Sequence, residues 1–201
     1  MLKGISLCLL MLLPAILLAQ KIEPVNIDLK SLNLQRIETN QRGMVVLGSW
    51  AAANIVVGTA GYFIAKDDEW KAFHGMNAIW NVANGFIALA GYAGTQKERT
   101  ANLSSVDMLH RYESTKRLYL INAGLDAVYI GTGVFLIERG KTQSDYKTWE
   151  GFGKSVAMQG VFLLFFDGVM YASHQSRDKH WYKLMEGICI TGNGIGLKLN
   201  I

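Results

Sequence analysis

Apolar residues along the chain gather into four long, uninterrupted runs. The runs cover residues 44–65, 72–94, 118–137 and 155–172. Each contains about 18–23 residues, the length that an α-helix needs to cross a hydrocarbon core of about 30 Å. Because an isolated strand in lipid would leave its backbone groups unpaired, the runs predict four transmembrane helices. The predicted fold is all-α, a membrane bundle of four helices.

Two other architectures fit the pattern less well. A membrane β-barrel would show alternating segments of about ten residues, whereas these runs are continuous. A buried helical bundle of a soluble protein would show amphipathic helices, whereas these runs are apolar on all sides. The soluble bundle stays open as an alternative. Half of the residues are hydrophobic and 18% are charged, against about 25% charged in typical soluble domains.

The first nineteen residues have the pattern of a secretory signal peptide. One lysine precedes an apolar run from Ile5 to Leu18, and Ala19 offers a small residue for cleavage. The run is about 14 residues long, short of the roughly 20 that a span needs. An uncleaved anchor is the alternative. Cleavage would leave Cys189 as the only cysteine, which excludes a disulfide within the mature chain.

A charged nonapeptide occurs twice, ahead of the first and third runs. LQRIETNQR covers 34–42 and LHRYESTKR covers 109–117, and both fit L-x-R-x-E-[T/S]-x-x-R. The first and third runs align at an offset of 72 residues, and the second and fourth at 83. In each nonapeptide a glutamate precedes an arginine by four residues, an order that favours a helix. We interpret the chain as two tandem copies of one unit, with chance similarity of apolar helices as the alternative.

Each unit has an amphipathic lead, a span, a loop and a second span. Two spans return the chain to the same side of the membrane, so the two helical hairpins would be parallel. The tail is expected to form a short extra helix, a re-entrant piece or a cap on the bundle. The predicted segments are a signal peptide at 1–19, leads at 20–43 and 95–117, hairpins at 44–94 and 118–174, and the tail at 175–201.

Polar side chains interrupt the apolar runs at helical spacing. In the second run a histidine and three asparagines, at spacings of three, four and three residues, lie on one stripe of a helix. An acid in hydrocarbon costs at least about 2.5–3.5 kcal/mol, and an interhelical hydrogen bond recovers about 0.6 kcal/mol. We therefore expect the polar residues to meet inside the bundle. They are Asn54, His74, Asn77, Asn81, Asn84, Asn122, Asp126, Gln159 and Asp167.

The cluster supports two functional interpretations. In the first its residues are structural and fix the register of the helices. In the second Asp126 and Asp167 bind a proton or an ion in a small transporter, because acids inside a membrane usually mark such pathways. The duplication places both aspartates at positions that match Asn54 and Asn84, so we expect these four residues to meet at one depth.

Enzymatic chemistry has little support in the sequence. The chain has neither an H-E-x-x-H helix nor a G-x-S-x-G elbow. A metal site built from His110, His174 and His180 can be imagined, but their spacing fits no familiar ligand pattern. We therefore predict no enzyme activity, no metal and no cofactor.

The net charge of +4 does not indicate nucleic acid, because Lys and Arg are scattered among the polar connections. The expected partner is a lipid bilayer, in the inner membrane of a bacterium; protein partners are not predicted, and a homo-oligomer stays open. A cleaved signal puts the mature amino end outside. Six Lys and Arg then lie in the inner loops and thirteen in the outer segments, the reverse of the positive-inside rule. We give the signal sequence more weight.

The strings RGMVVLGSWAAANIVVG and FHGMNAIWNVAN resemble a family of small bacterial membrane proteins of unknown function, found in Bacteroidota. The similarity covers roughly residues 42–92. It implies a multi-pass helical protein with a leader sequence, and it implies no activity, ligand or catalytic residue.

Overall fold

Four long helices make up most of the computed structural model, which describes residues 29–179, 181, 188–191 and 194–197. The helices are α2 (Leu29–Ile64), α3 (Asp68–Thr100), α4 (Ser105–Gly140) and α5 (Tyr146–Gln175). The predicted signal peptide at 1–19 lies outside the described residues. The prediction of a helical bundle is confirmed for the chain between residues 28 and 178, which forms one compact unit.

The tail differs from the short extra helix considered for it. Strands β1 (Ile188–Thr191) and β2 (Gly194–Leu197) pair antiparallel, with Ile188 opposite Leu197 and Thr191 opposite Gly194. The β-branched residues in this segment favour a strand, and its glycines disfavour a helix. This hairpin belongs to a separate unit from the bundle.

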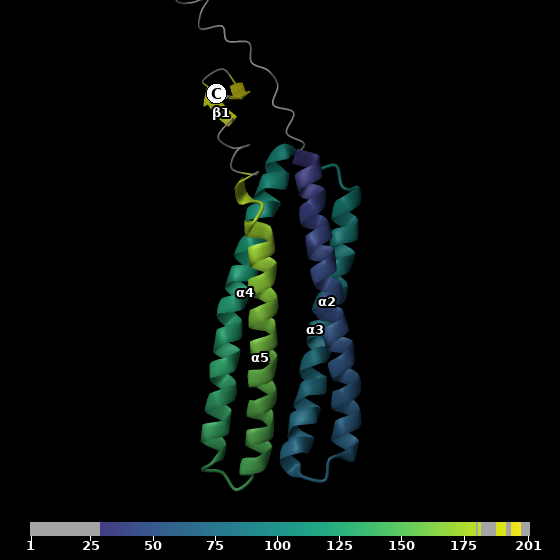
Figure 1. Ribbon diagram of the computed structural model, residues 1–201, viewed down its shortest axis with the longest axis vertical. Coiled ribbons are helices and arrows are strands. Elements are labelled where there is room, and N and C mark those ends of the chain that lie inside the picture. Colours follow the sequence, from purple (N-terminus) through teal and green to yellow (C-terminus); the bar gives the residue numbers. More distant parts are fainter. Residues whose placement is uncertain (1–28, 180, 182–187, 192–193, 198–201) are drawn as a thin grey trace, which may run out of the picture. The chain divides into compact units, whose positions relative to one another are not determined.

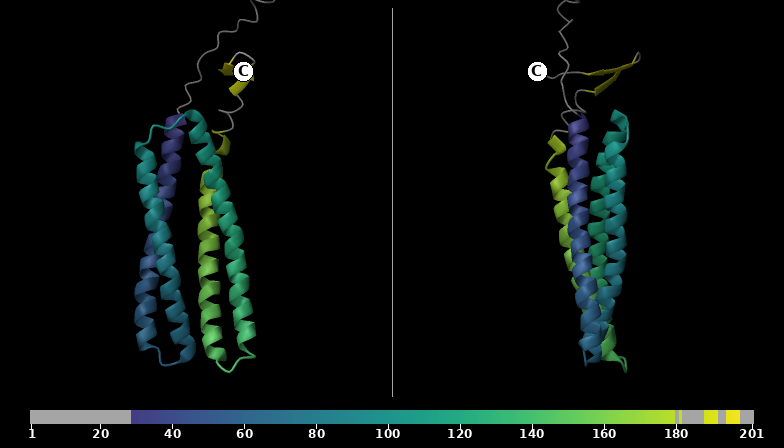
Figure 2. Two further views of the ribbon diagram at one scale, coloured as in Figure 1. Left: turned by 180° about the vertical axis from the view of Figure 1, so that it is seen from behind. Right: turned by 90° about the vertical axis from the view of Figure 1, so that its right-hand side faces the viewer.

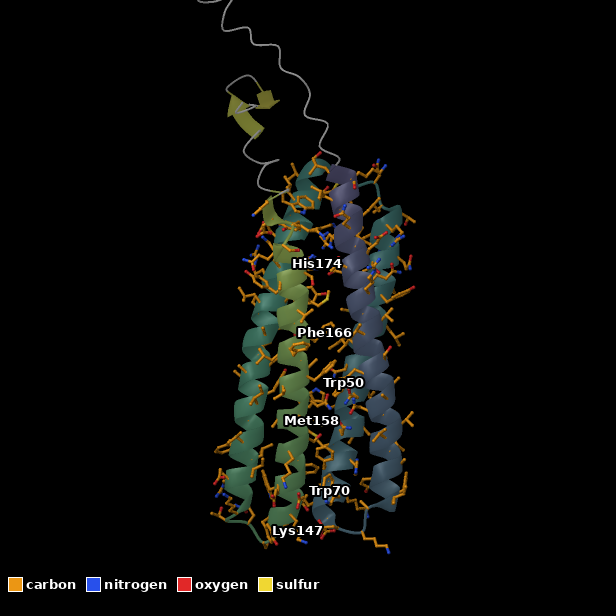
Figure 3. All side chains as sticks on the ribbon, in the orientation of Figure 1. Trp50, Trp70, Lys147, Met158, Phe166 and His174 are labelled. Carbon is orange, nitrogen blue, oxygen red and sulfur yellow. The ribbon has the colours of Figure 1, made fainter. Side chains whose placement is uncertain are left out.

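The four helices form two hairpins, α2 with α3 and α4 with α5. Both tight turns lie at the same end of the bundle, and the α3–α4 connection lies at the other (Figures 1 and 2). The hairpins contact each other mainly through α3 and α5. We call the two ends of the bundle the turn end and the connection end. Figure 3 places Trp70 and Lys147 at the turn end and His174 toward the connection end.

Helices α2 and α4 begin well before their apolar runs, so each includes its charged nonapeptide. Ser104 caps α4 through a capping box, in which the Asp107 backbone N–H donates to the Ser104 hydroxyl. The glutamates of the nonapeptides have partners other than the predicted arginines. Glu38 lies 3.9 Å from Arg99 of α3, and Glu113 pairs with Lys116 at 3.2 Å.

Among the described helices, α2, α4 and α5 are long and apolar enough to cross a membrane. Helix α3 differs because the predicted stripe of polar residues lowers its hydropathy. Its opposite face is apolar and exposed, with Ile79, Phe86 and Leu89 each more than 70% accessible. Helix α3 therefore has polar residues inside and apolar residues outside, the inverse of a helix on the surface of a soluble protein.

Glycines let the helices of each hairpin approach closely. A Cβ at Gly133 would lie 2.5 Å from the backbone nitrogen of Ala157, and one at Gly61 would lie 2.4 Å from the His74 ring. A Cβ at Gly131 or Gly94 would meet nothing within 4 Å. The close packing that small residues permit in membrane helices therefore operates at only some of the chain's glycines.

Candidate functional site

Side-chain amides join three helices in the middle of the bundle. Asn77 of α3 donates to the Asn54 Oδ1 atom of α2 at 2.8 Å. Gln159 of α5 donates through Nε2 to the Asn77 Oδ1 atom, and the Trp50 indole of α2 donates to the Gln159 Oε1 atom at 3.0 Å. Because every bond crosses between helices, these residues connect the two hairpins.

The amide network continues along α3 through the remaining asparagines of the stripe. Asn81 donates to the Asn77 backbone oxygen at 2.8 Å, and Asn84 donates to the Asn81 Oδ1 atom at 3.3 Å. Asn81 and Gln159 are fully buried. Hydrogen-bonded amides of this kind are the usual way to bury polar groups at low cost.

His74 lies on the same stripe but does not join the network. Its ring packs against Gly61 of α2, nearer the turn end, with Trp70 and Phe73 as aromatic neighbours. Its Nδ1 atom is buried and has no hydrogen-bond partner in the described part of the chain. His74 was expected to meet the other polar residues inside the bundle; its ring instead packs against helix α2.

Asp126 of α4 and Asp167 of α5 lie side by side within reach of a hydrogen bond, and Asn122 lies within reach of Asp167. The aspartates are 3% and 4% exposed, and the Asp126 Oδ2 atom has no hydrogen-bond partner among the described residues. Glycine positions the pair: a Cβ at Gly160 of α5 would lie 3.0 Å from the Asp126 backbone oxygen. A larger residue there would separate α4 from α5.

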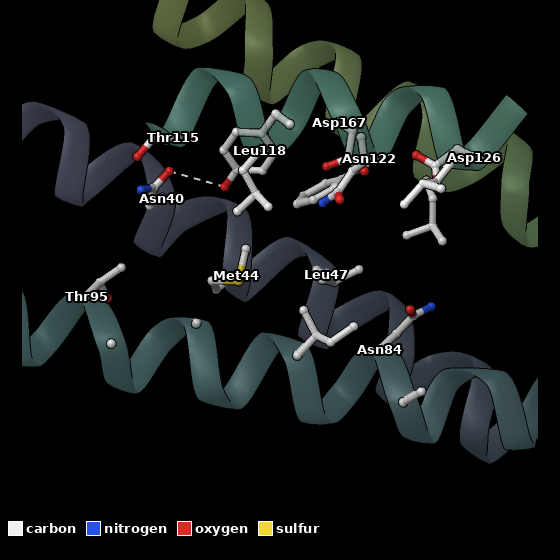
Figure 4. Close-up of a pocket in the computed structure, with 18 of the residues that line it drawn as sticks. Asn40, Met44, Leu47, Asn84, Thr95, Thr115, Leu118, Asn122, Asp126 and Asp167 are labelled. Atoms are coloured by element: carbon white, nitrogen blue, oxygen red, sulfur yellow. Dashed lines mark hydrogen bonds between the residues drawn. The ribbon is translucent and has the colours of Figure 1, made fainter. Parts of the chain in front are cut away.

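A cavity of about 740 Å³ lies beside the aspartates, with walls from all four helices. Asn122, Asp126 and Asp167 line one side, and Asn84 faces them from α3 (Figure 4). Most of the remaining wall is apolar and includes Met44, Leu47, Ile87, Leu118, Leu163 and Phe166. The four matching positions therefore do not all meet, because Asn54 lies in the amide network and does not line this cavity.

An ion-pair cluster lines the cavity toward the connection end. Arg36 is 3% exposed, bonds to Asn33 at 3.0 Å and to Thr115 at 3.3 Å, and pairs with one carboxylate oxygen of Glu98. Arg111 pairs with the other oxygen of Glu98. Arg36 and Arg111 are the third residues of the two nonapeptides. The repeated motif marked both arginines, but nothing in the sequence marked Glu98 as their common partner.

Nothing in the sequence indicated a second group of polar contacts at the connection end. The Asn40 Oδ1 atom accepts from the Tyr119 hydroxyl at 3.2 Å and lies 2.9 Å from Nε2 of the fully buried His174. Lys116 pairs with Asp178 at 2.9 Å. Within the described residues, no three His, Cys, Asp or Glu side chains gather where they could hold a metal ion. His180, considered for such a site, lies outside the described residues.

Ion pairs link the hairpins at the turn end. Lys147 lies 2.5 Å from Asp67, and Lys154 lies 2.5 Å from Glu69. The hydrogen bond from Lys147, together with the backbone N–H of Glu69, lowers the pKa of Asp67 below its usual 3.8. The same hydrogen bond raises the pKa of Lys147. Both side chains are well exposed, so water weakens this contact.

The site has two parts with different chemistry. The amide network satisfies its own hydrogen bonds. The aspartates face a cavity, and one carboxylate oxygen of Asp126 bonds to none of the described residues. Two carboxylates within hydrogen-bond reach of each other repel unless a proton or a cation lies between them. The arrangement can therefore take up positive charge.

No curated protein and no solved structure matches the chain at a significant level. A family model does match, over residues 46–168, which is more than half of the chain and includes parts of all four helices. The match thus extends beyond the first hairpin, to which the resemblance in the sequence was confined. The chain belongs to DUF6992, a family of unknown function.

Proposed function

We propose that the chain is a four-span integral membrane protein in which the amide network holds two hairpins together and Asp126 and Asp167 bind a proton or a cation. The bound charge would serve a small carrier rather than an enzyme. One observation carries the proposal: two buried, neighbouring carboxyl groups line a cavity, and no residue that the structure describes bonds to the Asp126 Oδ2 atom.

The fourth span in this proposal is α3. Residues 72–94 contain no Asp, Glu, Lys or Arg, and 23 residues of helix extend about 34 Å. Asn77, Asn81 and Asn84 are buried, so the polar stripe would not meet lipid, whereas the exposed face is apolar. Helix α3 also packs against two apolar helices of similar length, α2 and α5. These features support a span whose low hydropathy comes only from its inner face.

Topology reporters test the spans. We expect fusions at Lys66 and Lys147 to report one side of the membrane and a fusion at Leu103 to report the other. If Lys66 and Leu103 report the same side, α3 does not cross and the four-span proposal is wrong. The same fusions decide orientation. We propose that the protein lies in the bacterial inner membrane with the turn end in the cytoplasm. The predicted signal peptide requires this orientation, whereas the count of Lys and Arg under the positive-inside rule favours the opposite one.

Contacts at equivalent positions support the proposal that the hairpins are copies of one unit. Gly61 packs on His74, and Gly133, 72 residues later, packs on Ala157, 83 residues after His74. In the nonapeptides, Ile37 and Tyr112 occupy matching positions and are each 1% exposed. Unrelated apolar helices would have no reason to repeat both the crossing points and the burial.

Flux across proteoliposomes tests the carboxyl pair. We expect wild-type protein to carry a pH-gradient-dependent flux and the Asp126→Asn and Asp167→Asn variants to lose it while they still fold. Asp68→Asn, which makes the same exchange at an exposed acid outside the cavity lining, serves as the matched control and should retain flux. If the wild type carries no such flux, the carrier is ruled out; if the Asp variants lose melting stability instead, the acids are structural.

A further inference from the structure

We propose that the cavity admits a lipophilic organic monocation from the side, between α3 and α4, and holds its positive charge at Asp126 and Asp167. This inference names the ligand class of the carboxyl pair and rests on the function proposed above. Three properties of the cavity carry it: where it opens, what charge it presents and how its walls are made.

Side-chain contacts bound the cavity toward each end of the bundle and leave an opening between α3 and α4. Toward the turn end, Trp80 and Tyr129 meet edge to face with ring centroids 5.0 Å apart. Toward the connection end, Arg36 and Glu98 pair across the cavity. Between these two closures α3 and α4 make few contacts with each other.

The rim of the side opening is apolar and exposed. Ile79 and Ile87 of α3 are 71% and 58% accessible, and Leu118 and Leu125 of α4 are 57% and 48% accessible. All four line the cavity. In a membrane this rim would face acyl chains, so a molecule dissolved in the lipid could enter without crossing a polar barrier.

The charge inside the cavity is negative. The described lining residues include one cation, Arg36, and its charge is balanced by Glu98. Asp126 and Asp167 have no Lys or Arg beside them in the lining. An anionic lipid headgroup would meet repulsion here, whereas a single positive charge would complement the pair in a medium of low dielectric.

The size and the walls suit an organic ion better than a metal ion. A volume of about 740 Å³ lies within the range of roughly 300–1,000 Å³ found for small-molecule sites. A hard cation would require an all-oxygen shell of several ligands. Here the oxygens of the two acids, Asn122 and Asn84 occupy only part of a wall that is otherwise mostly apolar, with side chains such as Leu163 and Phe166. A hydrophobic body around one positive charge fits both features.

Tetraphenylphosphonium and tetraphenylborate form a matched pair of probes, because they have nearly the same size and hydrophobicity and opposite charge. We expect the full-length protein in lipid nanodiscs to bind the phosphonium saturably and the borate not at all. In the double variant Asp126→Asn/Asp167→Asn, with its helical content checked by circular dichroism, phosphonium affinity should fall at least about tenfold.

Two further variants test the side entrance. Ile87→Trp narrows the rim and should weaken or slow phosphonium binding. Phe86→Trp introduces the same indole at the adjacent position, where the side chain is exposed but lies outside the cavity lining, and should leave binding unchanged. Equal effects of the two substitutions would overturn the side entrance.

The outcomes separate the ligand class from the function. If both ions bind equally, or if the double variant binds phosphonium as the wild type does, the proposed ligand class is wrong. If phosphonium does not bind but the pH-gradient-dependent flux persists, only the ligand class fails. If neither is seen, the proposed function fails with it.

Discussion

The two hairpins cross at matching positions with different residues. In the first hairpin Asn54 of α2 meets Asn77 of α3, and the two amides bond at 2.8 Å. At the matching offsets the second hairpin has Asp126 in α4 and Gly160 in α5. Gly160 offers no side chain, and its Cα lies close to the Asp126 backbone. One crossing is thus filled by a hydrogen-bonded pair of amides, whereas the other leaves an acid facing a cavity.

The comparison shows how the same helical hairpin can contain a structural hydrogen-bond network in one case and a candidate binding site in the other. A side-chain amide both donates and accepts, so a chain of amides can satisfy itself. An ionised carboxylate only accepts, and next to a glycine it has no donor. The amide network therefore satisfies the polar groups of the first crossing, whereas we propose that a proton or a cation completes the second.

The largest effect is expected from Gln159→Leu, which breaks the amide network. The substitution leaves Asn77 Oδ1 and Trp50 Nε1 without their bonds to Gln159. Each buried group left unpaired costs about 1–3 kcal/mol. Thermal unfolding of the purified protein in detergent should show a clear loss of stability; an unchanged melting temperature would mean that the network is not structural.

A somewhat smaller loss is expected from Gly133→Ala, which tests the packing that brings α4 and α5 together. The new Cβ would lie 2.5 Å from the Ala157 backbone nitrogen. Overpacking of this kind typically costs about 1–3 kcal/mol. Gly131→Ala is the control, since its Cβ meets nothing within 4 Å. Equal melting temperatures for the two variants would contradict the close approach.

An effect of opposite sign is expected from Asp126→Asn. The amide is neutral, keeps the shape and can donate to Asp167, so repulsion between two buried carboxylates disappears. Stability should rise by on the order of 1 kcal/mol, in contrast to the loss in Gln159→Leu. The same melting assay measures both. A loss of stability in this variant would instead mean that Asp126 and Asp167 stabilise the fold, as the amide network is expected to do.

The smallest effect is expected at the turn end, from Lys147→Ala. The hydrogen bond from Lys147 depresses the folded-state pKa of Asp67, so its stabilisation is present above the ordinary pKa of 3.8 and is lost as the pH falls through the lower folded value. Wild type and variant should therefore differ slightly near neutral pH and converge in acid. A difference that persists in strong acid would show that Lys147 contributes by packing.

The sequence predicted much of the fold because hydrophobic runs and polar spacing are local properties. The length of the runs indicates helices, and the spacing of Asn77, Asn81 and Asn84 fixes one face that is buried. The pairing of Asp126 with Asp167 could also be anticipated, because the proposed duplication would give the two acids matching depths. The strands of the tail were not anticipated, since short apolar runs do not distinguish a strand from a helix.

Only the tertiary structure decided which polar groups become neighbours. Spacing along a helix sets the face and height of a side chain, but its partners depend on which helices touch and how closely. Gly160 lets α4 and α5 pack closely, and helix α2 packs against His74. Helices α3 and α4 make few contacts, which leaves room for the cavity between them. Glu98 meets both Arg36 and Arg111 for the same reason: contacts between distant helices are set by the packing of whole surfaces, which no local pattern encodes.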